Sequence, residues 1–167
     1  MHVFLLWTLK IKMLMNNSDL NFNNIRHVSV RKKTASRICS AQVLYEETFL
    51  ETNINFIIKS YMKNYLPDIL LGLGIKNIDI DLFNTIVFGV HNNISTIDQI
   101  LSKNLAQSWS IDRLSRTEKS VLRLAIFELC FEKKFKKTTI INEYISIIEI
   151  FGGDANFANG ILDKISK

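Results

Sequence analysis

The sequence predicts an all-α protein, and three observations carry that prediction. From Ser29 onward, apolar residues recur three and four positions apart, which is the spacing of one face of an α-helix. The 167 residues include one proline and six glycines, whereas an all-β sandwich uses many of both in its turns. The β-branched pair Ile140–Ile141 also stands in a helical pattern rather than an alternating one.

Two helices are expected before the first loop. The first covers 34–50, and the second covers 53–65, with Asn53 as its cap and Pro67 as its stop. Gly72 and Gly74 then mark a loop. The buried stripe expected on the first helix is Ile38, Ala41, Tyr45 and Phe49, with Lys33 and Arg37 at its edge. The inward side expected on the second is Phe56, Ile57, Ser60 and Tyr61.

Capping residues divide the rest of the chain into further helices. The expected caps are Asp79, Ser95, Ser115 and Asp154, and the two serines are followed three positions later by Asp98 and Glu118, as in a capping box. Another helix covers about 139–151, and Gly152 ends it because glycine adopts the left-handed conformation readily. The sequence therefore predicts about seven helices.

The net charge of +5 comes from one short segment. Residues 26–37 hold five basic side chains and no acidic one, whereas the rest of the chain carries 16 of each sign. These five are Arg26, Arg31, Lys32, Lys33 and Arg37. A basic arm on a nearly neutral body is a candidate contact for a large anion, of which phosphate is the commonest.

Residues 1–28 are expected to form a poorly ordered extension, for which Met13 or Met15 is an alternative start. Their apolar run, 3–9, is far shorter than the ~20 residues of a membrane span and lacks the layout of a secretory signal. We therefore expect a cytoplasmic protein without a membrane anchor.

The residue patterns of catalysis are missing from the sequence. Gly72-x-Gly74 lacks the strand, third glycine and Lys-Ser/Thr pair of a phosphate loop, and the three histidines are far apart. Cys39 and Cys130 are expected to be structural thiols inside helices. Glu143 is either a buried carboxylate or, as we prefer, a surface or hydrogen-bonded structural one. We expect no enzyme, metal or cofactor.

Five pieces of sequence follow one another in order along residues 31–167. They are Arg37-x4-Gln42-x-Leu44-Tyr45; Phe88-Gly89-Val90; Trp109-x3-Arg113-Leu114-x3-Glu118-Lys119-x-Val121-Leu122-Arg123-Leu124-Ala125-x2-Glu128-Leu129; Ile141-Asn142-Glu143; and Phe151-Gly152 with Phe157-x-Asn159-Gly160-x-Leu162-Asp163. Each piece alone is ordinary helix sequence. Their ordered combination resembles the NusB family of bacterial transcription antitermination factors.

The resemblance implies a NusB-like helical domain over 29–167, built from two packed three-helix bundles of about 29–106 and 107–167. Members of the family are not enzymes. They bind the boxA element of ribosomal RNA transcripts together with the ribosomal protein NusE, and this complex helps RNA polymerase read through terminators. The same resemblance assigns RNA binding to Arg31, Lys32, Lys33, Arg37, Phe151, Asp154 and Phe157, and partner binding to Glu118.

The chemistry of these side chains is consistent with RNA binding, but several of them also have a structural explanation. Lysine and arginine neutralise phosphates without reading sequence, whereas exposed aromatic rings stack on single-stranded bases. Phe151 and Phe157 are equally well explained as core residues, and Asp154 as a helix cap. A second basic cluster, 133–137, has four lysines that either bind an anion or complement a helix dipole.

The arm is sparser than in many relatives, which predicts weak RNA binding alone and stronger binding with NusE. Two other functions remain open. One is a helical adaptor that binds only proteins, and the other is a fragment of a ribosomal RNA cytosine methyltransferase with a NusB-like N-terminal part. RNA titration with and without NusE separates the first of these from an antitermination factor.

Overall fold

The computed structural model describes residues 28–50 and 52–167, and all regular structure within these ranges is helical, which confirms the predicted fold class. There are seven α-helices in this part of the chain, together with one 3-10 helix and one π-helix. In chain order they are α3 (Val28–Glu47), α4 (Ile54–Asn64), α5 (Leu66–Leu73), α6 (Ile80–Asn104), η1 (Ile111–Arg113), α7 (Arg116–Phe127), η2 (Glu128–Glu132), α8 (Lys137–Ile150) and α9 (Ala155–Ser166). The extension expected over 1–28 lies outside the described residues, except for Val28.

The helix starts follow the local capping chemistry. The side chains of Asn53, Asp79, Ser115 and Asp154 each accept a hydrogen bond from a backbone N–H two or three residues later, at 2.8–3.1 Å. Ser115 and Glu118 form the complete capping box. Gly152 has a φ of 75°, the left-handed conformation predicted after α8. Four of the predicted boundaries are thus confirmed by their side-chain geometry.

The break expected at Ser95 is wrong, because α6 continues from Ile80 to Asn104. The helix only bends at Asn93, where φ and ψ are −120° and 15° and the side-chain amide donates to the carbonyl of Gly89 at 2.8 Å. Ile97 and Leu101 are fully buried, so the second half of α6 keeps an apolar face toward the core. That burial outweighs the local capping signal.

Two expectations around α4 are also corrected. The loop expected at Gly72 and Gly74 is instead the end of a short helix, α5, in which Pro67 occupies the first turn, where a missing N–H costs nothing. Gly74 ends that helix with a φ of 58°. Phe56 points outward and is 64% exposed, whereas Ile57 and Tyr61 of the same helix are fully buried.

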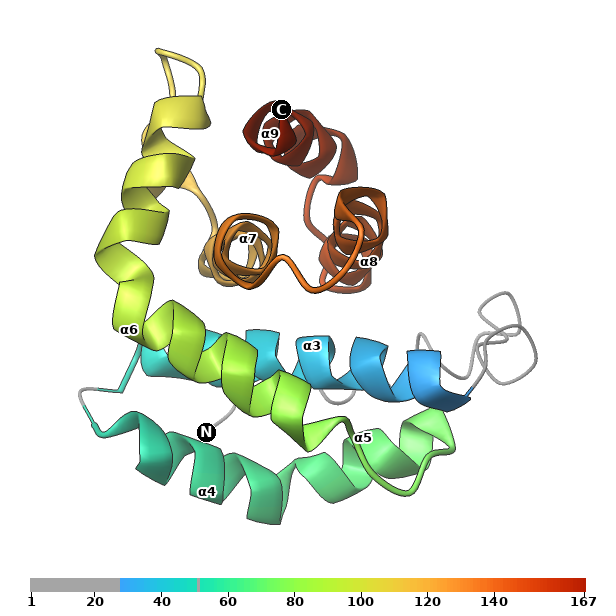
Figure 1. The fold of residues 1–167 in the computed structure, drawn as a ribbon. Coiled ribbons are helices and arrows are strands. Elements are labelled where there is room, and N and C mark those ends of the chain that lie inside the picture. The colour runs from blue at the N-terminus through green and yellow to red at the C-terminus, as the bar shows by residue number, and fades with distance from the viewer. Residues whose placement is uncertain (1–27, 51) are drawn as a thin grey trace.

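The helices pack around α3 and α6. In Figure 1, α3 crosses the middle of the molecule, with α4 and α5 on one side and α7, α8 and α9 on the other. α6 packs against both α3 and α7, and also contacts α9. The core is therefore shared across the chain, and a division into bundles of about 29–106 and 107–167 stays a prediction. Within the described ranges, none of the helices combines the length and apolar character needed to cross a membrane.

Candidate nucleic-acid interface

The basic stretch at the start of α3 is anchored through its backbone and its side chains. The carbonyl of Lys32 accepts hydrogen bonds from the Ser36 hydroxyl at 3.0 Å and from the Asp79 N–H at 3.5 Å. The Arg31 guanidinium donates to the carbonyl of Leu73 at 3.3 Å. Arg31, Lys32 and Lys33 are all half-buried. Three of the predicted cations therefore lie at the surface on a fixed helix.

The fourth predicted cation, Arg37, lies in the core. Its side chain is 3% exposed, and its Nε and Nη2 donate to the two carboxylate oxygens of Glu128 at 2.7 and 2.9 Å. The Tyr144 hydroxyl donates to the same carboxylate at 2.6 Å. Burial alone would lower the pKa of Arg37, but the Glu128 hydrogen bond and the neighbouring charges outweigh it and raise that pKa. The structure therefore removes Arg37 from the side chains that can reach RNA.

Glu143 belongs to the same buried group. It is 7% exposed, accepts a hydrogen bond from the Thr34 hydroxyl at 2.6 Å, and lies 3.6 Å from an Arg37 nitrogen. Glu143 is thus buried rather than on the helix surface, and it also makes a structural hydrogen bond, whose donor Thr34 lies on α3 rather than in a loop. Burying these charges is tolerated because each has a partner of opposite charge or a hydrogen bond.

The three remaining RNA candidates lie in the turn between α8 and α9 and in the first turn of α9, in different environments. Phe151 is 8% exposed and belongs to the core, so its ring does not offer a free face to a base. Phe157 is half-buried, and its ring centroid lies 5.3 Å from that of Trp109. Asp154 is exposed and caps α9. Of these three side chains, only Phe157 and Asp154 reach the surface.

Glu118, the predicted partner contact, lies beside Asp154. One of its carboxylate oxygens completes the capping box with Ser115, and the other accepts the backbone N–H of Asp154 at 3.3 Å. Glu118 thus joins the start of α7 to the α8–α9 turn. Any partner that touches one of these two acids also lies close to the other.

The structure separates the predicted RNA residues into two groups. The cations of α3 lie near the start of α8, because the Lys33 ammonium is 5.2 Å from the centroid of the Phe135 ring. Phe157 and Asp154 follow the other end of α8. This helix has 14 residues, which at ~1.5 Å per residue is a length of about 20 Å. The two groups therefore lie near opposite ends of α8.

Sequence reasoning missed an exposed aromatic and cation pair in the second group. Trp109 is 43% exposed, and the Arg113 guanidinium carbon lies 5.1 Å from the centroid of its ring. Arg113 also donates to the carbonyl of Ser108 at 3.0 Å, which holds it in place. The spacing of Trp109 and Arg113, four residues apart, could have indicated this pair from the sequence. The contact between Trp109 and Phe157 could be found only from the tertiary structure.

The other reactive groups have structural surroundings. Cys39 is fully buried, which raises the pKa of its thiol to about 12, and burial also raises the pKa of Cys130. Such thiols are poor nucleophiles. His91 pairs with Glu47 at the surface. Within the described ranges, no three His, Cys, Asp or Glu side chains are placed to hold a metal ion.

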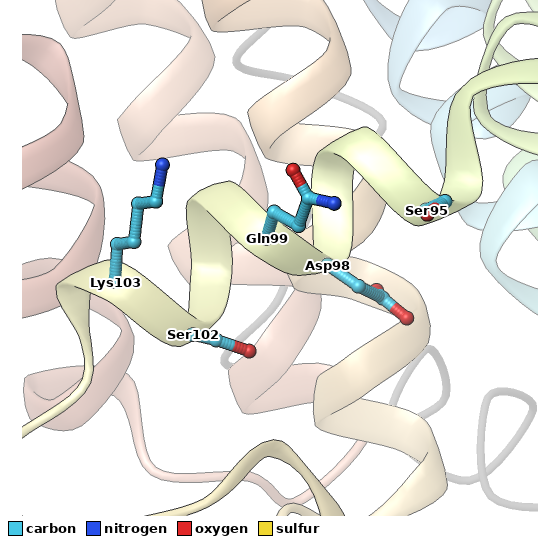
Figure 2. Close-up of a pocket in the computed structure, with 5 residues that line it drawn as sticks. All are labelled: Ser95, Asp98, Gln99, Ser102 and Lys103. Carbon is cyan, nitrogen blue, oxygen red and sulfur yellow. The ribbon is translucent and has the colours of Figure 1, made fainter.

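A hollow of about 450 Å³ lies along the second half of α6. Figure 2 shows that the side chains lining it, among the residues that the structure describes, project from this one helix: Ser95, Asp98, Gln99, Ser102 and Lys103. The Asp98 carboxylate is already bound by Arg123 at 2.7 and 2.8 Å. The hollow includes none of the predicted RNA residues, so we do not assign it a role in that site.

The fold and this site define the class as a small helical protein with separate cationic and aromatic surfaces. The comparisons identify the family within that class. The model of the NusB family matches residues 34–167, and the chain therefore belongs to the NusB family of transcription antitermination proteins.

Curated relatives match over nearly their whole length. Transcription antitermination protein NusB of Sphingopyxis alaskensis is 30% identical over 139 residues, which are 82% of this chain and 93% of that protein. The NusB protein of Clostridium botulinum strain Alaska E43 is 34% identical over 134 residues, which are 79% of this chain and 96% of that protein.

Solved structures share the fold. NusB of T. maritima has a TM-score of 0.63 and 28% identity, covering 80% of this chain and 89% of its own. A chain in the crystal structure of the antitermination factors NusB and NusE in complex with dsRNA has a TM-score of 0.65 and 26% identity. That match covers 81% of this chain and 96% of the other.

Proposed function

We propose that this protein binds boxA RNA of ribosomal RNA transcripts together with NusE, and that the complex helps RNA polymerase to read through terminators. In this proposal it acts in the cytoplasm as a binding factor, without catalysis and without a cofactor. The observation that carries the proposal is the likeness over 81% of the chain to a protein solved in a complex of NusB, NusE and dsRNA.

The cations of α3 supply the phosphate contacts in this proposal. Arg31, Lys32 and Lys33 lie on an anchored helix, and all three are partly exposed. Lysine and arginine bound to phosphates release counterions, so affinity falls as salt rises and does not depend on sequence. Arg37 has no part in this contact, because its charge is used by Glu128.

Base recognition is assigned to the α8–α9 turn. Phe157 with Trp109 supplies aromatic surface, and the exposed Asp154 carboxylate can accept hydrogen bonds from base edges. An acid repels phosphate, which is acceptable where bases rather than backbone face the protein. Phe151 contributes by holding the turn from the core side.

NusE is expected to bind near Glu118, because this side chain joins α7 to the same turn. A partner seated there adds its own RNA contacts next to Asp154. The three cations of α3 are few for tight binding, so we expect weak RNA affinity alone and a large gain when NusE is present.

A gel-shift titration at low salt tests the proposal. The protein is titrated onto a labelled boxA RNA and onto a scrambled RNA of equal length, each with and without NusE. We expect a preference for boxA that strengthens with NusE. The double variant Arg31→Gln/Lys33→Gln should weaken binding to both RNAs, since the change removes phosphate contacts.

The matched control is Lys59→Gln/Lys63→Gln on α4, which removes the same charge from exposed positions away from the predicted site. It should leave RNA affinity nearly unchanged. Equal binding to boxA and scrambled RNA, in the presence of NusE as well as in its absence, would overturn the proposal. Binding to NusE without any RNA preference would support the alternative of a protein-binding helical adaptor.

A further inference from the structure

A second cationic surface lies at the turn between η2 and α8. Its four lysines, Lys133, Lys134, Lys136 and Lys137, are all exposed. Two acids lie in the preceding five-residue element: Glu128 is fully buried against Arg37, and Glu132 is half-buried. We call residues 133–137 the lysine turn. The lysine turn and these two acids together carry a net positive charge at the surface.

A helix dipole stabilises only two of these four lysines. Lys133 and Lys134 follow the carboxyl end of η2, where a cation is favourable. Lys136 and Lys137 stand at the amino end of α8, as its N-cap and first residue, where the dipole is itself positive. The first turn of α8 contains no acid to balance them. An external anion that binds here would therefore offset charges that the fold itself leaves unbalanced.

The lysine turn packs onto the basic start of α3. Its aromatic residue, Phe135, has its ring centroid 5.2 Å from the ammonium of Lys33 and 5.0 Å from the guanidinium carbon of Arg37. In Figure 1 the connection between α7 and α8 accordingly runs close to α3. Two basic segments about one hundred positions apart in sequence therefore share one surface.

The turn is held in a defined conformation. Lys133 has a φ of 51°, and its N–H donates to the carbonyl of Glu128 at 3.0 Å, which closes the end of η2. The ammonium of Lys137 donates to the carbonyl of Ser166 at the end of α9. Lys134 and Lys136 are consequently presented from a fixed backbone, beside the cations of α3.

We propose that the lysine turn and the cations at the start of α3 together bind the phosphate backbone of single-stranded RNA that flanks the recognised element. This inference rests on the proposed RNA-binding function and extends its surface to a second segment. Lysines are compact cations that neutralise phosphates without bidentate geometry, so this surface adds affinity and no base specificity. RNA is the favoured occupant because one strand can cross both segments with a regular series of negative charges.

The test measures how affinity depends on salt, with twenty-nucleotide oligouridylate as the probe. The triple variant Lys133→Gln/Lys134→Gln/Lys136→Gln spares Lys137, whose ammonium is already bound. Each phosphate contact contributes ~0.7 to the slope of log K against log salt for single strands, so three lost contacts reduce it by about 2. Affinity at 0.1 M salt should then fall by about 100-fold.

Two further variants separate the surface from the total charge. Changing Lys59, Lys63 and Lys103 to glutamine removes the same charge from three exposed positions on α4 and α6, and should change the slope by less than about 0.5. The triple change to arginine at positions 133, 134 and 136 keeps the charge and should keep the slope. Because oligouridylate contains no boxA, the result stands whether or not boxA is preferred.

Equal slopes for the lysine-turn and control variants overturn the inference, since the effect would then come from net charge alone. Unchanged affinity of the lysine-turn variant overturns it as well. A sedimentation assay with vesicles of phosphatidylcholine and phosphatidylserine covers the other anionic partner. If that variant loses vesicle binding but keeps RNA binding, the surface belongs to a membrane and the inference is wrong. Thermal unfolding shows whether each variant is folded.

Discussion

Replacing Arg37 by leucine tests the buried group described above. The change removes both hydrogen bonds from the guanidinium to the Glu128 carboxylate, at 2.7 and 2.9 Å. Glu128 is fully buried and would keep only the hydrogen bond from Tyr144. Glu143 would lose the cation that now lies 3.6 Å away. The variant therefore removes the guanidinium from beside two buried carboxylates.

The expected cost is large for a protein of this size. Removing one partner of a buried ion pair costs ~3–5 kcal/mol, because the other charge stays buried and uncompensated. Since domains unfold at ~5–15 kcal/mol, the variant should lose a large share of its stability. The reverse change, Glu128→Leu, should cost less, because Glu143 remains within 3.6 Å of Arg37 and offsets part of its charge. The double variant should recover much of the loss, since apolar side chains replace the whole pair.

An ion pair of the same geometry at the surface provides the control. Arg123 binds Asp98 through two nitrogens at 2.7 and 2.8 Å, but the two side chains are 13% and 30% exposed. Water compensates either charge when its partner is removed, so Arg123→Leu should cost about 1 kcal/mol or less. Comparison of the two variants isolates the effect of burial from that of hydrogen-bond geometry.

Urea unfolding, followed by circular dichroism, measures these differences for the two single variants and the double variant. A cost below about 1 kcal/mol for Arg37→Leu would refute the buried pair, because burial makes the loss of one partner expensive. The RNA salt slope gives a second readout. If that slope falls by ~0.7 while stability is unchanged, Arg37 binds a phosphate as the sequence suggested.

Three further predictions concern packing, capping and pH. Gly89→Ala places a Cβ 2.0 Å from the Phe127 ring and should cost ~1–3 kcal/mol, whereas Gly160→Ala meets nothing within 4 Å and should gain ~0.5–1 kcal/mol; chemical denaturation of both compares them. Ser115→Ala removes the cap of α7 and should cost ~1 kcal/mol, lowering Tm by ~2–4 °C in calorimetry. Burial raises the pKa of Cys39 from 9.0 to about 12 and raises the pKa values of two buried tyrosines, so these groups ionise more easily when unfolded. Stability should therefore be full below pH 9 and fall above it, by ~1.4 kcal/mol per pH unit for Cys39 alone, a loss that Cys39→Ala should reduce in alkaline unfolding curves.

Helix starts were predicted correctly where a capping side chain bonds to a nearby backbone N–H. A capping side chain reaches a backbone N–H only two or three residues away, so Asp79, Ser115 and Asp154 could be identified without the fold. The capping signal at Ser95 failed because burial of Ile97 and Leu101 kept α6 continuous. Local hydrogen bonds and core packing compete, and the larger apolar burial prevailed there.

The candidate site was predictable in composition but not in arrangement. The concentration of basic residues over 26–37 is a property of the sequence, as is the cluster over 133–137. Which of these charges face solvent depends on helix rotation against distant elements. Arg37 is one turn from Lys33, yet it faces Glu128 in the core while Lys33 reaches the surface beside Phe135.

By itself, the sequence determined the helical class, four capped helix starts, the NusB-like order of motifs and the location of the positive charge. These follow from periodicity and from contacts within one turn, which need no knowledge of the remaining chain. The tertiary structure alone decided that Arg37 is a core residue, that Glu118 meets Asp154, and that the lysine turn joins the start of α3. Each of these contacts joins helices far apart in sequence, and only the packing of the common core brings them together.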